Sequence, residues 1–262
     1  MRSKGLDKYL WFQKSRNSIG QICSSLQCNL FDYASLTCSP SYLCPLGLPQ
    51  MYKIILNKYT NFLCLKLGLC FFRDTLDMYS AEVKSIAKIL LGKIAVALKI
   101  KPEEMDKLFD DELGQRIRLN YYPRCPEPDK VIGLTPHSDS TGLTILLQAN
   151  EVEGLQIKKN AKWVSVKPLP NALVVNVGDI LEIITNGTYR SIEHRGVVNS
   201  EKERLSVAAF HNIGLGKEIG PMRSLVERHK AAFFKSVTTE EYFNGLFSRE
   251  LDGKAYLDVM RL

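Results

Sequence analysis

Residues 133–148, with the sequence GLTPHSDSTGLTILLQ, contain the pattern that decides the fold and the site. The first half places His137 and Asp139 two residues apart, so on an extended backbone both side chains leave from one face. The second half, Leu143–Leu147, is a short apolar run that predicts a strand. His194 follows His137 after 57 residues, a separation that several strands can fold back together. Two imidazoles and one carboxylate are the donor set that holds Fe(II) on one face and leaves the opposite positions open.

Short strands are predicted on both sides of this stretch. From Gln115, apolar residues alternate with polar ones, so Asn120 and Tyr122 should point the same way. The later strand candidates are residues 155–157, 163–166, 173–177, 191–198 and 204–211. Turn sequences such as Gly178-Asp179 and Asn186-Gly187 separate them. Many short strands after a helical layer predict a mainly β fold with flanking helices, a double-stranded β-helix or jelly roll.

Three helices are expected around these strands. From Asp74, apolar residues recur at spacings of three and four, which predicts an amphipathic helix. A second helix should begin at Pro102, a residue that suits the first helical position, and end near Phe109. A last helix should begin near Thr239 and include Phe247.

The first 70 residues differ from the rest in charge, cysteine content and periodicity. They contain eight basic and two acidic residues and so account for six of the seven net positive charges, together with six of the seven cysteines. We therefore divide the chain into an atypical, poorly ordered segment (residues 1–70), a helical layer (71–112) and the jelly-roll domain with its C-terminal helix (113–262).

The same charge distribution argues against nucleic acid as a partner, because residues 71–262 have almost no net charge to attract phosphates. The apolar stretch from Ile54 to Phe72 is interrupted by Lys58 and Lys66, so it is too short and too charged to span a membrane. The first twenty residues lack the apolar region of a signal peptide. We expect a cytoplasmic protein with reduced thiols.

Arg204, Ser206 and Phe210 share one face of a predicted strand. The guanidinium of Arg204 has the planar geometry to bind a carboxylate through two hydrogen bonds, and the hydroxyl of Ser206 offers another. A dicarboxylate co-substrate needs such groups at the end that lies away from a metal.

These residues occur within a longer set of motifs: NYYPRCPEP (120–128), GLTPHSD (133–139), TGLTILLQ (141–148), NVGD (176–179), Asn186-Gly187, His194 and Arg204-Leu-Ser206. Together they resemble the plant 2-oxoglutarate/Fe(II)-dependent dioxygenases, with the greatest similarity to the codeine O-demethylase and senescence-related subgroup. The resemblance extends from about Phe72 to Leu262. Residues 1–70 do not resemble the N-terminal region of that family.

The resemblance implies that His137, Asp139 and His194 ligate Fe(II) and that Arg204, Ser206, Asn120 and Tyr122 hold 2-oxoglutarate. It also implies that Phe210 lines the substrate pocket and that ascorbate supports turnover. The expected reaction is hydroxylation or O-demethylation of a small specialised metabolite, with dioxygen as oxidant and succinate and CO2 as products. We expect a monomer.

Two other interpretations remain open from the sequence. One is a jelly roll that keeps the metal site but has impaired catalysis, because its N-terminal region does not match the family. The other is a metal-binding cupin of unrelated function, which leaves the Arg204/Ser206 and Asn120/Tyr122 pairs unexplained. Hydroxylation and O-demethylation also remain alternatives, since both begin with attack on a C–H bond.

Overall fold

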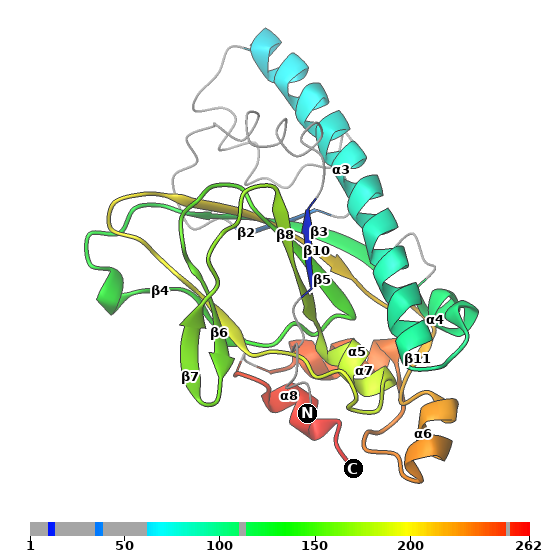
Figure 1. The fold of residues 1–262 in the computed structure, drawn as a ribbon. Coiled ribbons are helices and arrows are strands. Elements are labelled where there is room, and N and C mark those ends of the chain that lie inside the picture. The colour runs from blue at the N-terminus through cyan, green and yellow to red at the C-terminus, as the bar shows by residue number, and fades with distance from the viewer. Residues whose placement is uncertain (1–9, 14–34, 39–61, 110–113, 250–251) are drawn as a thin grey trace.

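The computed structural model describes residues 10–13, 35–38, 62–109, 114–249 and 252–262, with side chains from Thr75 onward. Two antiparallel sheets form the centre of this part of the chain, with helices along one side and at one end of them (Figure 1). The mainly β class with flanking helices is confirmed. The prediction that residues 1–70 are poorly ordered falls mostly outside the described residues.

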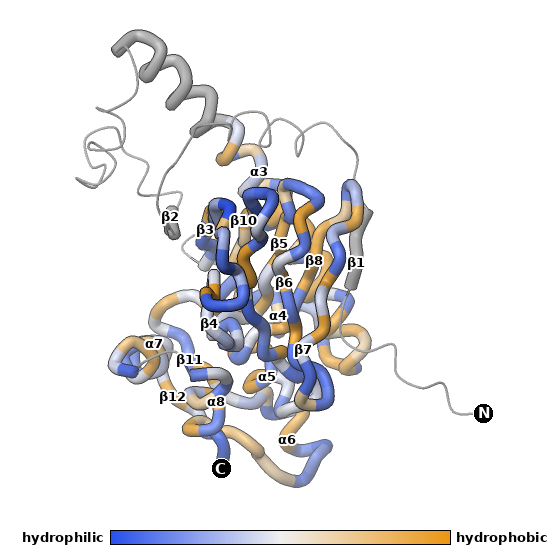
Figure 2. Tube along the Cα trace, turned by 90° about the vertical axis from the view of Figure 1, so that its left-hand side faces the viewer, coloured by the Kyte–Doolittle hydropathy of each residue, from blue (hydrophilic) through white to orange (hydrophobic). Residues whose placement is uncertain are grey.

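The larger sheet contains six strands, and every neighbouring pair is antiparallel. Their order across the sheet is β1 (Leu10–Gln13), β8 (Ala172–Val177), β5 (Leu143–Gln148), β10 (Arg204–His211), β3 (Gln115–Tyr122) and β2 (Ser35–Cys38). Figure 2 shows apolar residues concentrated along β5, β8 and β10, where the inward-facing side chains form the core.

The smaller sheet contains four antiparallel strands and carries both histidines of the predicted site. Their order is β4 (Ile132–His137), β9 (His194–Val197), β6 (Leu155–Lys159) and β7 (Lys162–Ser165). A third pair, β11 (Glu218–Ile219) and β12 (Val237–Thr238), lies outside both sheets.

Helix α3 (Phe62–Ala97) runs along the larger sheet, and α4 (Pro102–Phe109) packs beside its C-terminal end (Figure 1). The predicted amphipathic face is confirmed, because Leu76, Tyr79 and Val83 are buried in the core. The helix nevertheless begins twelve residues before Asp74. Residues 62–73 contain only two charged residues, Lys66 and Arg73, so their sequence has too little polar contrast to mark an amphipathic helix.

The remaining helices gather at one end of the sheets (Figure 1). They are α5 (Asp179–Ile184), α6 (Arg223–His229), α7 (Thr239–Phe247) and α8 (Ala255–Val259). A short 3-10 turn at Pro128–Lys130 lies apart from them, just before β4. Helix α7 was predicted, and a capping box at Thr238 and Glu241 fixes its start. The interpretation of Gly178-Asp179 as a simple turn is incomplete, because α5 begins there. In the part of the chain that the structure describes, no helix combines the length and apolar character needed to cross a membrane.

Candidate metal centre and co-substrate site

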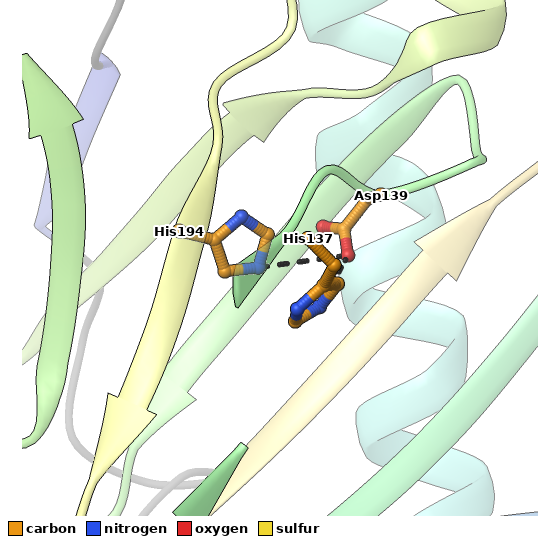
Figure 3. Close-up of side chains that lie close together, drawn as sticks. All are labelled: His137, Asp139 and His194. Atoms are coloured by element: carbon orange, nitrogen blue, oxygen red, sulfur yellow. Dashed lines mark ion pairs between the residues drawn. The ribbon is translucent and has the colours of Figure 1, made fainter. Parts of the chain in front are cut away.

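Three potential metal ligands meet at the junction of β4 and β9. His137 ends β4 and His194 begins β9, and the two residues are direct partners across the strands. Asp139 follows in the loop between β4 and β5. Its Oδ1 lies 3.7 Å from Nε2 of His137 and 3.6 Å from Nε2 of His194 (Figure 3). The potential ligand atoms all lie within 4.8 Å of one another, close enough to share one ion.

Backbone carbonyls fix the orientation of both imidazoles. Nδ1 of His137 lies 2.7 Å from the Thr135 carbonyl oxygen, and Nδ1 of His194 lies 3.1 Å from that of Ile192. A carbonyl only accepts, so each Nδ1 carries the proton and each Nε2 keeps its lone pair for a metal. Burial, and then the neighbouring His194, lower the pKa of His137, which favours the neutral form that ligates.

The Asp139 carboxylate is held through one oxygen and leaves the other for a metal. Its Oδ2 accepts hydrogen bonds from the Thr144 hydroxyl at 2.6 Å and the Asn176 amide at 2.8 Å. Burial acts to raise the pKa of Asp139, but the charge that the two imidazoles carry when protonated, together with these hydrogen bonds, outweighs it and lowers the pKa below its usual value. The carboxylate is therefore ionised, and Oδ1 faces both imidazoles.

This donor set suits Fe(II). Two neutral imidazoles and one carboxylate on one face are the arrangement that oxygen-activating Fe(II) proteins use, with positions left open for other ligands. Within the described residues, this is the one cluster of three histidine, cysteine or acidic side chains close enough for a single ion.

Arg204 forms the other end of the site, at the start of β10. Arg204 is paired with Tyr122 on the neighbouring strand β3, and Ser206 is paired with Asn120 on the same strand. The guanidinium carbon lies 5.2 Å from the centre of the Tyr122 ring. Nη2 donates to Gln148 Oε1 at 3.3 Å, and Nη1 makes a long contact of 3.5 Å to Ser206 Oγ.

Arg204 is a buried cation whose donors are incompletely satisfied. Its side chain is 3% exposed, and its Nε has no hydrogen-bond partner within the described structure. Burial lowers the pKa of Arg204, but arginine stays charged at any physiological pH. A buried, unpaired charge is costly, so this position favours a bound anion.

Gly154 makes room for that guanidinium. A Cβ at this position would lie 2.4 Å from Cδ of Arg204 and 2.9 Å from its Nε, which no ordinary packing permits. A side chain at residue 154 would therefore displace Arg204.

One pocket brings all of the predicted site residues together. Its lining includes the ligands His137, Asp139 and His194, the residues Asn120, Tyr122, Arg204 and Ser206, and Phe210. Most of the other lining side chains are apolar. Phe210 lies further along β10 than Ser206, and Arg118 lies 5.7 Å from its ring centre. The pocket therefore combines a cluster of potential metal ligands with the buried cation of Arg204, and the aromatic ring of Phe210 lies further along β10.

Sequence reasoning missed the side chains that hold the ligands in place. Thr144 and Asn176 bind Asp139, and they are partners across β5 and β8. Gln148, which binds Arg204, was also missed. All three occur in the quoted motifs, but only the strand register shows which group they contact.

The fold and the site together define a jelly-roll protein with a two-histidine, one-carboxylate metal centre. Residues 113–213 match the profile of the 2OG-Fe(II) oxygenase superfamily. The family resemblance expected from the sequence is therefore confirmed.

Relatives in plants support the same assignment. The chain is 72% identical over 192 residues to Protein SRG1 of Arabidopsis thaliana, covering 73% of this chain and 54% of that protein. It is 54% identical over 192 residues to codeine O-demethylase of Papaver somniferum, covering 73% of this chain and 53% of that protein. The chain thus spans about half the length of the curated relatives it matches.

A solved structure confirms the jelly-roll fold. The crystal structure of JOX2 in complex with 2OG, Fe and JA superposes with a TM-score of 0.73 at 33% identity. The match covers 88% of this chain and 64% of JOX2.

Proposed function

We propose that this protein is a dioxygenase that uses Fe(II) and 2-oxoglutarate to oxidise a small specialised metabolite. The oxidation is a hydroxylation or an O-demethylation, and the other products are succinate and CO2. In this proposal His137, Asp139 and His194 hold the metal, while Arg204, Ser206, Asn120 and Tyr122 hold the co-substrate. When bound, Fe(II) would allow dioxygen to oxidise the substrate while 2-oxoglutarate loses CO2 and becomes succinate.

The observation that carries the proposal is the unpaired cation in the same pocket as the three ligand atoms. The buried guanidinium of Arg204 offers donors without an acidic partner among the described residues, and 2-oxoglutarate has a second carboxylate to accept them. A pocket that served only to store a metal would not need a buried arginine.

The apolar part of the pocket would determine which C–H bond is oxidised. Phe210 offers a flat wall against which an aromatic substrate can pack, and the surrounding apolar side chains limit access of water. The relatives include an oxoglutarate-dependent flavonoid 7-O-demethylase of Ocimum basilicum, which is 56% identical over 191 residues. Methoxylated aromatic compounds are therefore the first substrates to test.

The test is a screen of methoxylated aromatics with purified full-length protein, Fe(II), 2-oxoglutarate and ascorbate. Succinate would report turnover, and formaldehyde would distinguish O-demethylation from hydroxylation of a ring carbon. We expect substrate-dependent succinate in the wild type and none in Asp139→Ala. Iron binding without succinate for any compound would favour a catalytically impaired metal-binding jelly roll instead.

The proposal includes the sequence-based expectation of a cytoplasmic monomer that acts without nucleic acid or a membrane. Size-exclusion chromatography with light scattering would check the oligomeric state. A fluorescent fusion expressed in plant cells would check the location.

A further inference from the structure

A buried ionic cluster lies behind the metal ligands, outside the pocket. Its centre is Glu182 on α5, which is 0% exposed. Lys254 donates to its Oε2 at 2.9 Å, and Arg261 donates to its Oε1 at 3.0 Å. Both cations belong to the C-terminal segment 252–262, so this carboxylate joins that segment to α5.

Ser191 links the cluster to Asp179 and, along the chain, to His194. Its backbone N–H donates to Glu182 Oε2 at 2.7 Å, and its carbonyl accepts from Lys254 at 3.1 Å. Its hydroxyl lies within hydrogen-bond distance of Asp179 and of Glu182. Ser191 precedes His194 by three residues, so the cluster anchors the start of β9.

Asp179 connects the cluster to the loop that contains His137 and Asp139. Its Oδ2 accepts from the hydroxyl of Ser138, at 2.8 Å, and Ser138 lies between His137 and Asp139. Its backbone N–H donates to the carbonyl of Asp139 at 2.7 Å. The α5 N-terminus therefore holds the ligand loop through a side chain and through the backbone.

The C-terminal segment also contacts the ligand loop directly. The N–H of Ser138 donates to the Gly253 carbonyl at 3.0 Å, and the N–H of Gly253 donates to the Pro136 carbonyl at 3.2 Å. Gly253 has φ of +49°, a left-handed conformation that favours glycine. Lys254 follows immediately, so its bond to Glu182 fixes the position of this contact.

We propose that Glu182, clamped by Lys254 and Arg261, is a positioning residue that holds the ligand loop and the start of β9 at the spacing needed to bind the metal. The inference rests on the proposed function in taking this centre as the Fe(II) site. None of the three residues lines the pocket. Each would act through Ser191, Asp179 and Ser138, or through the contact of Gly253 with the ligand loop.

The physical reason is that a buried carboxylate is stable only while hydrogen bonds and opposite charges offset the cost of burying its charge. Burial acts to raise the pKa of Glu182, and the hydrogen bond and charge of Lys254 outweigh it and keep the pKa below its usual value. If Lys254 loses its charge, Glu182 must move toward other donors or toward water. Either movement shifts Ser191 and releases Gly253 from the ligand loop. Groups that orient metal ligands commonly change metal affinity by about 10- to 100-fold when mutated.

The experiment is an anaerobic titration with Co(II), followed by its visible absorption, on purified full-length variants. Lys254→Met should weaken Co(II) binding by about tenfold or more. Lys235→Met is the matched control, because Lys235 also donates to the C-terminal segment, at the Val259 carbonyl, but does not contact Glu182. The control should bind Co(II) like the wild type. Lys254→Arg should recover most of the affinity, since it retains the charge.

A double-mutant cycle tests whether the effect passes through the ligand loop. Ser138→Ala cuts the connection to Asp179, so adding it to Lys254→Met should weaken Co(II) binding by less than the product of the two single effects. Wild-type affinity in Lys254→Met, equal losses in Lys254→Met and Lys235→Met, or fully multiplicative effects would each overturn the inference. These readings need no turnover. If the wild type binds metal but forms no succinate, the proposed function fails and the positioning test still gives its answer.

Discussion

Arg204→Lys tests whether the buried guanidinium binds the co-substrate. The variant keeps the positive charge but replaces five donors in a planar fork by one ammonium group. In the structure the guanidinium reaches toward Gln148 and Ser206 and has an unpartnered Nε. A lysine ammonium cannot serve all of these directions together.

The expected magnitude follows from the lost hydrogen bonds. A hydrogen bond to a charged group contributes about 1.5–3 kcal/mol, and the variant should lose at least one to the co-substrate carboxylate. Since about 1.4 kcal/mol corresponds to a tenfold change, the 2-oxoglutarate requirement should rise by at least roughly tenfold. Iron binding should not change, because Arg204 contacts none of the three ligands in the described hydrogen bonds and ion pairs.

The assay measures succinate release against 2-oxoglutarate concentration, with Fe(II) affinity measured in parallel. Arg195→Lys is the matched control, because Arg195 lines the same pocket but uses its Nε to bind Gln156 at 2.8 Å. Gly154→Ala should reproduce the defect without touching the charge, since its Cβ would displace Arg204. An unchanged 2-oxoglutarate dependence in Arg204→Lys would show that the anion binds elsewhere.

Three further outcomes are expected. Asp139→Ala should abolish turnover and most Fe(II) binding in a calorimetric titration, and wild-type affinity would refute the ligand assignment. Phe210→Ala should reduce product more than succinate, because the substrate loses its aromatic wall while the co-substrate keeps its site; equal losses would place Phe210 in a purely structural role. Burial lowers the pKa of His211 to about 4, so the folded state resists protonation and stability should fall as pH drops from about 6.5 to about 4, by on the order of 3 kcal/mol. Denaturant unfolding at several pH values should show a smaller loss in His211→Gln, and an equal loss would assign the acid sensitivity to other groups.

The sequence predicted the elements that have a clear period or a clear boundary. The strand at Arg204–His211 and the helices at Pro102–Phe109 and Thr239–Phe247 have the predicted bounds. Two of these begin with a local signal, a proline in the first turn of α4 and a capping box in α7. Such signals depend on neighbouring residues alone, so a single sequence is enough to find them.

The missed elements depend on tertiary contacts. Helices α6 and α8 are short, and neither has a side-chain hydrogen bond at its N-cap. Helix α5 has only six residues, too few for a helical period to be recognised in the sequence. Strand β4 contains Gly133 and Pro136 and is irregular where it pairs with β9, which hides the alternation of a strand.

Candidate site residues can be proposed from the sequence because the chemistry of a possible ligand depends on its residue type. The sequence predicted His137, Asp139 and His194 as metal ligands, and the structure brings the three side chains together. The hydrogen bonds from Thr144 and Asn176 depend instead on which residues face each other across β5 and β8. A shift of one residue in that pairing would turn these groups away from Asp139.

The pairing of β4 with β9 also affects the residues proposed to hold the co-substrate. His137 faces His194, and Leu134 faces Gly196 two residues further along β9, with an irregularity in the register between the two pairs. A Cβ on Gly196 would lie 3.2 Å from the Leu134 Cβ and 3.2 Å from the Tyr122 hydroxyl, so this glycine lets β9 approach both. Tyr122 in turn stacks with Arg204. The close approach of β9 to Leu134, next to the paired histidines, therefore also brings β9 against the ring on which the Arg204 guanidinium lies.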